Sequence, residues 1–158
     1  MSLSDKPFDI VVFGASGYTG RLVAEYLAAE YAGSDLKWAM AGRSLDKLAT
    51  VRAEMGISDA VELLAVDVDN PDSVAQMVDA CRVVITTVGP YQLFGDELIK
   101  QCAEQGTDYV DLSGEPSWMH ETIAQYSSAA KASGARIVHS CGFDSIPFDL
   151  GVYRLQQH

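Results

Sequence analysis

The chain alternates short, continuous apolar runs with segments in which apolar residues recur every three or four positions. The runs predict six β-strands, and the segments with helical spacing predict five α-helices. The strands are expected near residues 8–13, 36–41, 61–67, 82–87, 108–112 and 135–140, and the helices near residues 18–31, 45–55, 71–80, 94–105 and 117–133. Because the strands are continuous apolar runs, we expect both faces of the sheet to be covered.

Residues typical of helix ends support these boundaries. Three helices follow a start signal, and four precede a glycine that suits a left-handed helix end. The start signals are Ser44, Asn70-Pro71 and Glu115-Pro116, and the glycines are Gly33, Gly56, Gly106 and Gly134. Regular strand–helix alternation predicts right-handed crossovers. The predicted fold class is therefore α/β, a doubly wound parallel sheet of the NAD(P)-binding Rossmann fold with strand order 3-2-1-4-5-6, in one domain over residues 1–158.

The stretch GASGYTG, residues 14–20, joins the first predicted strand to the first predicted helix. At this turn of the fold, backbone N–H groups and the positive end of the helix dipole favour an anion. Gly14 is expected to permit a tight turn, Gly17 to let a pyrophosphate touch the main chain, and Gly20 to let the helix pack on the strand. The loop also contains Ala15, Ser16, Tyr18 and Thr19. The alternative is a glycine-rich turn that serves packing alone.

The end of the second strand indicates which dinucleotide is bound. An acidic residue that would hold a ribose 2′-hydroxyl is absent there, and Arg43, Ser44 and Lys47 stand in its place. A guanidinium can bind a 2′-phosphate through two charge-assisted hydrogen bonds. The sequence therefore favours NADP over NAD, unless Arg43 and Lys47 are solvated surface charges.

Two further strand ends carry weaker signals for the cofactor. Asp67 and Val68 close the third strand and are expected near the adenine, although helix capping explains the aspartate equally well. The sequence Val88-Gly89-Pro90 follows the fourth strand, across the topological switch from the glycine loop. The second ribose and the nicotinamide should pass this point.

No catalytic residue is assigned from the sequence. The Tyr/Lys pair of short-chain dehydrogenases is absent, because Tyr126 and Lys131 are five positions apart instead of four. Cys141 suits a thiol nucleophile, but a buried structural thiol is the favoured interpretation. Weaker candidates follow the predicted strands and also suit caps and turns: Tyr91, Asp111, Glu115, Asp144 and Asp149.

Composition excludes several other classes of protein. The net charge is -11, from 22 acidic and 11 basic residues, and it disfavours nucleic acid and anionic membranes as partners. No apolar run approaches the ~20 residues of a membrane span. The three cysteines form no C-x-x-C pair, and His120, His139 and His158 are scattered, so neither a disulfide framework nor a metal site is predicted. A cytoplasmic location is expected.

Several blocks together resemble the N-terminal half of the saccharopine dehydrogenase-like oxidoreductases, which include the bacterial trans-acting enoyl reductases. These blocks are the glycine loop at 14–20, AGRS at 41–44, VGPY at 88–91, GDELIKQC at 95–102, GTDYVDLSGE at 106–115 and HSCGFDSIPFD at 139–149. The resemblance implies an NAD(P)-dependent enzyme that acts on a small-molecule substrate. It places Gly14, Ser16, Gly17, Tyr18, Thr19 and Gly20 at the pyrophosphate, and Arg43 at the ribose phosphate.

The resemblance also implies that the chain is a truncated part of a two-domain enzyme, because family members continue into a substrate domain. The expected chemistry is hydride transfer between NADPH and a carbonyl, imine or enoyl group, and the isolated domain should not turn over. The alternative is a regulatory Rossmann module that senses NAD(P) without catalysis, because fold alone does not imply function. The sequence leaves homo-oligomerisation open.

Overall fold

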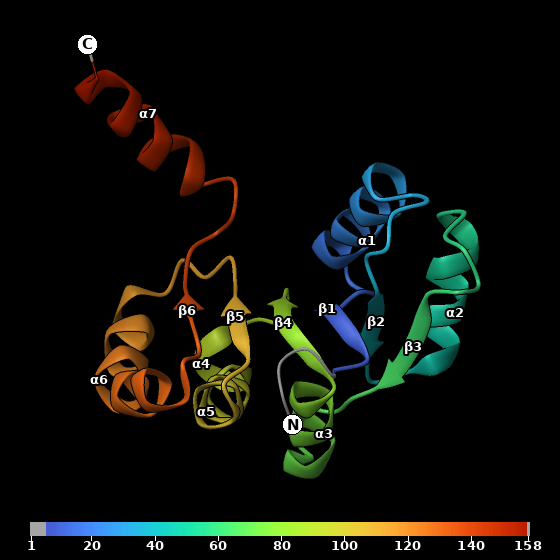
Figure 1. Cartoon of the computed structure of the whole chain (residues 1–158), viewed down its shortest axis with the longest axis horizontal. Helices are drawn as coiled ribbons and strands as arrows, with labels where there is room; N and C mark the ends of the chain where they lie inside the picture. Colours follow the sequence, from blue (N-terminus) through green and yellow to red (C-terminus); the bar gives the residue numbers. More distant parts are fainter. Residues whose placement is uncertain (1–5, 158) are drawn as a thin grey trace.

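The computed structural model describes residues 6–157, and a six-stranded parallel sheet runs through its centre (Figure 1). His158, considered above as a scattered histidine, lies outside this range. The strands are β1 (Phe8–Phe13), β2 (Trp38–Gly42), β3 (Glu62–Ala65), β4 (Cys81–Thr86), β5 (Asp108–Val110) and β6 (Ile137–Val138). Their order is β3-β2-β1-β4-β5-β6, with every pairing parallel. The predicted fold class and strand order are confirmed.

All five predicted helices are present, together with two that the sequence analysis missed. The predicted ones are α1 (Tyr18–Glu30), α2 (Leu45–Glu54), α3 (Pro71–Asp79), α5 (Asp96–Gln105) and α6 (Pro116–Ser133). The additional ones are the short α4 (Tyr91–Phe94) and the C-terminal α7 (Ile146–Gln156). A helix was expected to begin near residue 94; instead α4 ends there and α5 starts two residues later.

Helices cover the two faces of the sheet in separate layers. On one face, Ala24 and Leu27 of α1 and Leu48 and Val51 of α2 pack with Val12. On the other face, α3, α5 and α6 pack against the opposite side of the same strands. The adjacent Val11 and Val12 belong to different cores and are both fully buried. The continuous apolar runs therefore predicted two-sided burial correctly for the central strands β1 and β2, whereas the edge strands β3 and β6 contain no buried residue.

Most of the residues predicted to mark helix ends do so in the structure. The Ser44 hydroxyl accepts a hydrogen bond from Lys47 N at 3.3 Å and caps α2, and the Asn70 side chain caps α3 in the same way. The four predicted glycines all have positive φ values, between 64° and 86°. Glu115 precedes α6 as expected, but its carboxylate does not cap that helix. It serves another element, described below.

Helix α7 projects away from the two layers (Figure 1), and none of its residues is buried. Its apolar residues form two stripes on opposite sides of the helix, and within each stripe they are separated by four and then three positions. One stripe contains Ile146, Leu150 and Tyr153, and the other contains Phe148, Val152 and Leu155. This two-sided pattern lacks the single apolar face from which a surface helix is predicted. Across residues 6–157, no helix combines the length and hydropathy that crossing a bilayer requires.

Candidate functional site

The glycine loop joins β1 to α1 through a turn that two glycines make possible. Gly14 has a φ of 88°, and a Cβ there would lie 2.7 Å from Thr87 Oγ1. A Cβ at Gly20 would lie 2.1 Å from the Gly14 carbonyl oxygen, which cannot move away without unfolding the turn. Gly14 and Gly20 therefore have the packing roles that the sequence predicts.

The start of α1 leaves backbone N–H groups available beside this loop. Gly17 precedes the helix, no side chain caps it, and its first turn has no acidic residue. A Cβ at Gly17 would meet a single atom, Gly14 O at 3.3 Å, so the backbone can be approached closely. Since the first N–H groups of a helix have no partner within it, they favour an anion together with the helix dipole.

A pocket of about 260 Å³ opens beside this helix start. Four separate chain segments line it, and they follow β1, β2, β3 and β4. The lining residues are Phe13, Gly14, Ser16, Gly17, Gly42, Arg43, Val68, Thr87, Val88, Gly89 and Phe94. We call this pocket the switch-point groove, because it spans the point between β1 and β4 where the strand order reverses.

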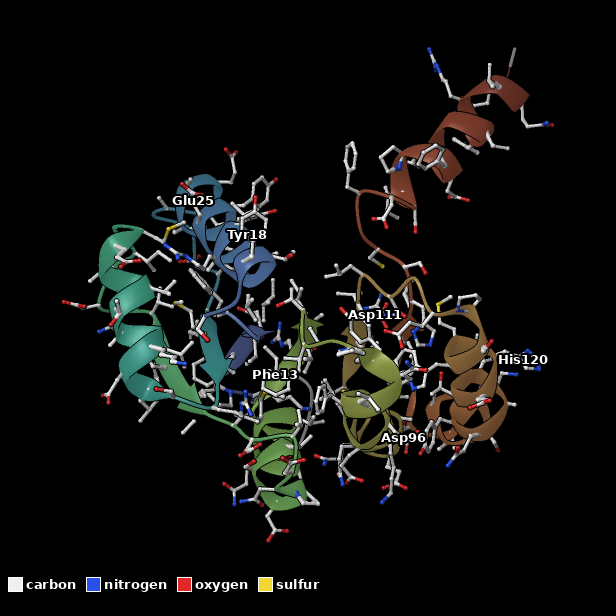
Figure 2. All side chains as sticks on the ribbon, turned by 180° about the vertical axis from the view of Figure 1, so that it is seen from behind. Phe13, Tyr18, Glu25, Asp96, Asp111 and His120 are labelled. Carbon is white, nitrogen blue, oxygen red and sulfur yellow. The ribbon has the colours of Figure 1, made fainter. Side chains whose placement is uncertain are left out.

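The groove brings together only part of the predicted site. Seven predicted residues line it: Gly14, Ser16, Gly17, Arg43, Val68, Val88 and Gly89. Of the others, Ala15 is buried beneath the loop, Gly20 packs against it, and Thr19 lines a second cavity. The groove lining does not include Tyr18, Ser44, Lys47, Asp67 or Pro90. Tyr18 is 85% exposed at the start of α1 (Figure 2).

Arg43 is the cation of the groove. Its side chain is exposed, and among residues 6–157 no ion pair involves it. Lys47, one helical turn later, is also exposed and lies outside the lining. Arg43 is therefore the charged group that could bind a phosphate in the groove, since no other Lys or Arg lines it among the described residues.

Asp67 forms a turn. Its Oδ1 accepts a hydrogen bond from Asp69 N at 3.2 Å, and its backbone N–H donates to Ser73 Oγ at 3.1 Å. This geometry supports the structural alternative that the sequence left open for the carboxylate. The next residue, Val68, does line the groove and offers an apolar contact.

A second cavity, of about 550 Å³, lies between α1 and the carboxyl ends of β4, β5 and β6. Thr87 lines both this cavity and the groove, so the two adjoin. The lining residues are Thr19, Val23, Ile85, Thr86, Thr87, Val110, Asp111, Leu112, Cys141, Gly142, Phe143 and Asp144. We call it the β5–β6 cavity. Three of the candidates from the sequence line it: Asp111, Cys141 and Asp144.

Glu115 and Tyr91, two weak candidates for catalysis, serve the structure. The Glu115 carboxylate accepts hydrogen bonds from Tyr91 N and Gln92 N, both at 2.8 Å, and so holds the first turn of α4. The Tyr91 ring is buried and stacks on Trp118 with 5.6 Å between ring centroids. Burial raises the pKa of Tyr91 to about 12, so this hydroxyl stays protonated.

Of the remaining candidates, Cys141, Asp144 and Asp149 also lack the features of a nucleophile or an acid–base pair, and Asp111 belongs to a network described below. Burial and the nearby Asp111 charge raise the pKa of Cys141, which disfavours its thiolate. Asp144 is exposed at the cavity, and Asp149 is exposed on α7. Tyr126 donates to Asp96 Oδ2 at 2.9 Å, and burial raises its pKa, as does that bond. No described residue is assigned as the catalyst.

The sequence analysis missed a buried network centred on Asp111. Its side chain is fully buried and accepts four hydrogen bonds. The donors are Tyr109 Oη at 2.8 Å, His139 Nδ1 at 2.7 Å, Ser113 N at 2.9 Å and Ser140 N at 2.9 Å. Burial alone would raise the pKa of Asp111, but these donors lower it below its usual value, the bond from His139 foremost.

A signal for the Asp111–His139 pair was present in the strand order. Tyr109 pairs with Ile137 and Val110 with Val138, so the next residues on the two strands, Asp111 and His139, meet. Treating the histidines as scattered along the chain overlooked this parallel register.

Comparisons with known proteins show the family to which this chain is related. A family model described as the saccharopine dehydrogenase NADP binding domain matches residues 10–138. Trans-acting enoyl reductases of Mycobacterium tuberculosis and Mycobacterium leprae are 45% and 44% identical over 156 residues. Each match covers 98% of this chain and 37% of the relative, so the chain spans little more than a third of their length.

Solved structures show the same fold at lower identity. Saccharopine dehydrogenase (L-Glu forming) from Saccharomyces cerevisiae superposes with a TM-score of 0.66 at 20% identity, over 87% of this chain and 28% of that one. Triphenylmethane reductase from Citrobacter sp., solved with NADP(H), gives a TM-score of 0.57 at 19% identity, over 84% and 48%. With the family model covering most of the described sheet, the chain belongs to the saccharopine dehydrogenase family, as its NADP-binding domain.

Proposed function

We propose that this chain is the cofactor half of an oxidoreductase that transfers a hydride between NADPH and a carbonyl, imine or enoyl group of a small molecule. One observation carries this proposal: the uncapped start of α1, the open backbone at Gly17 and the unpaired Arg43 face one groove. These groups fit a phosphorylated dinucleotide, because amides and a guanidinium are the donors that phosphates accept. When bound, the nicotinamide supplies the hydride.

Each predicted residue has a defined task in this proposal. The loop from Gly14 to Gly20 holds the pyrophosphate at the start of α1, where the first N–H groups of the helix have no partner within it, and Ser16 lines the edge of the groove. Arg43 binds the 2′-phosphate, with Ser44 and Lys47 beside it, and this preference makes NADP the cofactor over NAD. Val68 contacts the adenine next to Asp67. The segment of Val88, Gly89 and Pro90 guides the second ribose past β4.

The enzyme is favoured over the regulatory module. The curated relatives carry reductase names, and the family model describes a dehydrogenase domain. Because those relatives are much longer, we propose that a further domain completes the substrate site and that the 158 residues bind cofactor without turnover. A cytoplasmic location is proposed from the free thiols of the described cysteines, and the acidic charge argues against nucleic acid as a partner.

Calorimetric titration of the chain with NADPH and NADH tests the proposal. Arg43→Ala should weaken NADPH binding about 10- to 100-fold, the size of a lost charged hydrogen bond, and change NADH binding less than about twofold. Lys131→Ala removes an exposed cation on α6 and should change neither titration. Equal losses for both coenzymes would contradict the role of Arg43, and no heat from either would contradict cofactor binding altogether.

A further inference from the structure

One wall of the β5–β6 cavity is the segment that follows β6, from Ser140 to Asp144. Cys141, Gly142, Phe143 and Asp144 line the cavity from this side, and Thr19 and Val23 of α1 line it too. The cavity adjoins the switch-point groove at Thr87. A molecule that leaves the groove past Thr87 therefore meets this wall.

The wall is held in place by Asp111. The carboxylate accepts from Ser140 N at 2.9 Å, and the Asp111 carbonyl accepts from Cys141 N at 2.7 Å. Ser140 has a φ of 58°, and no other non-glycine residue between 6 and 157 has a positive φ. This conformation costs on the order of 1 kcal/mol and persists only where neighbouring groups hold it. The two bonds that Asp111 accepts do so, together with the bond that Ser140 Oγ donates to the Ser113 carbonyl at 2.7 Å.

Four donors fix the side chain of Asp111, which is labelled in Figure 2. Tyr109, His139 and Ser113 supply the other three donors to its carboxylate, and the His139 ring packs edge-on against Trp118 with 5.2 Å between centroids. Burying a carboxylate is costly unless donors compensate it, and a fully satisfied network specifies one geometry. The network therefore defines where the wall stands.

The dinucleotide supplies a reason for such a wall. In the proposed binding mode, Arg43 and Val68 hold the adenosine half on the β2–β3 side of the groove. The other half then extends past Thr87 towards β4 and β5, where Val23, Ile85 and Val110 offer an apolar surface for a flat ring. This step rests on the proposed function.

We propose that Asp111 is a positioning residue: by fixing the Ser140–Asp144 wall, it holds the nicotinamide half of NADP(H) in the β5–β6 cavity. Asp111 lies in the lining of this cavity, but its side chain is fully buried, so in this role the carboxylate acts through the wall. Binding of the adenosine half should therefore be independent of it.

Binding of two ligands distinguishes a positioning role of Asp111 from a general role in stability. NADPH occupies both halves of the site, and adenosine 2′,5′-bisphosphate carries the 2′-phosphate without a nicotinamide. Asp111→Asn should weaken NADPH binding about tenfold, the cost of reordering one or two side chains. It should change binding of the bisphosphate less than about twofold. In Asp111→Asn, the enhancement of NADPH fluorescence on binding should also be smaller than in the unaltered chain.

Two more variants make the test independent of the folding of Asp111→Asn. A Cβ at Gly142 would lie 2.8 Å from Leu112 Cβ, so Gly142→Ala displaces the wall and leaves the network intact. It should reproduce the selective loss of NADPH affinity. Asp108→Asn alters the opposite end of β5, where the aspartate pairs with exposed Arg136, and should change neither affinity.

The outcomes divide cleanly. Selective loss of NADPH affinity in Gly142→Ala, and in Asp111→Asn if it folds, supports the proposal. Equal loss of both ligands, or unchanged NADPH affinity in a folded variant, overturns it and leaves the proposed function standing. Failure of the unaltered chain to bind either ligand overturns the proposed function itself.

Discussion

Two loops meet at the carboxyl edge of this sheet, and they are shaped by opposite means. The loop after β1 takes its form from missing side chains, since a Cβ at Gly20 would lie 2.1 Å from the Gly14 oxygen. The segments after β5 and β6 take theirs from a buried side chain, Asp111, with four donors. The first arrangement is local in the chain, whereas the second joins residues about 30 positions apart. Substitutions in the glycine loop and in the Asp111 network should therefore change the stability of the protein to different extents.

The largest effect is expected at the glycine loop. Gly20→Ala places a methyl group against the Gly14 carbonyl, and this backbone group cannot rotate away as a side chain can. The free energy of unfolding should therefore fall by about 3 kcal/mol or more. Urea denaturation measures this loss. Gly114→Ala is the control: a Cβ there meets nothing within 4 Å, and the midpoint should stay nearly unchanged. Similar midpoints for the two variants would contradict the close approach.

A smaller effect is expected in the network. Tyr109→Phe removes the hydroxyl that donates to Asp111 Oδ2 and should cost about 1.5–3 kcal/mol of unfolding free energy, as expected for a bond to a charged acceptor. Tyr91→Phe is the comparison, because its hydroxyl has only neutral partners: it donates to Thr86 O at 3.2 Å and accepts a longer bond from Leu112 N at 3.4 Å, and about 1 kcal/mol is expected. Chemical denaturation of both variants measures which of them loses more unfolding free energy. A smaller loss for Tyr109→Phe than for Tyr91→Phe would contradict the prediction.

The smallest effect is the part of the pH dependence of stability that comes from Asp111. Hydrogen bonds, that from His139 foremost, keep the pKa of Asp111 below its usual 3.8 despite burial, so the folded state favours the carboxylate. The ionised Asp111 therefore contributes fully to stability at pH values above 3.8, and this contribution is lost as the pH falls below 3.8 towards the lowered pKa. Thermal melts between pH 6 and 2 should show a weaker decline in Asp111→Asn than in the unaltered chain. Parallel declines would argue against a charged Asp111.

The two loops also mark how much of the site could be predicted. Gly14, Gly17 and Arg43 were found because a tight turn and a charge at a strand end depend on neighbours in sequence. His139 was missed because its partner comes from another strand, and only the register of β5 on β6 places them together. Glu115 does precede α6 as expected, but its carboxylate binds the backbone of α4 because it reaches across to residues 91 and 92.

The amino-acid sequence by itself determined the strand order, the helix caps at Ser44 and Asn70, and the packed turn at Gly14 and Gly20. Each follows from apolar periodicity or from the conformation of one or two residues. Only the tertiary structure decided that Asp111 carries a network and that α7 stands clear of both layers. Those features depend on which distant groups lie within hydrogen-bonding or packing distance, and local spacing does not contain that information.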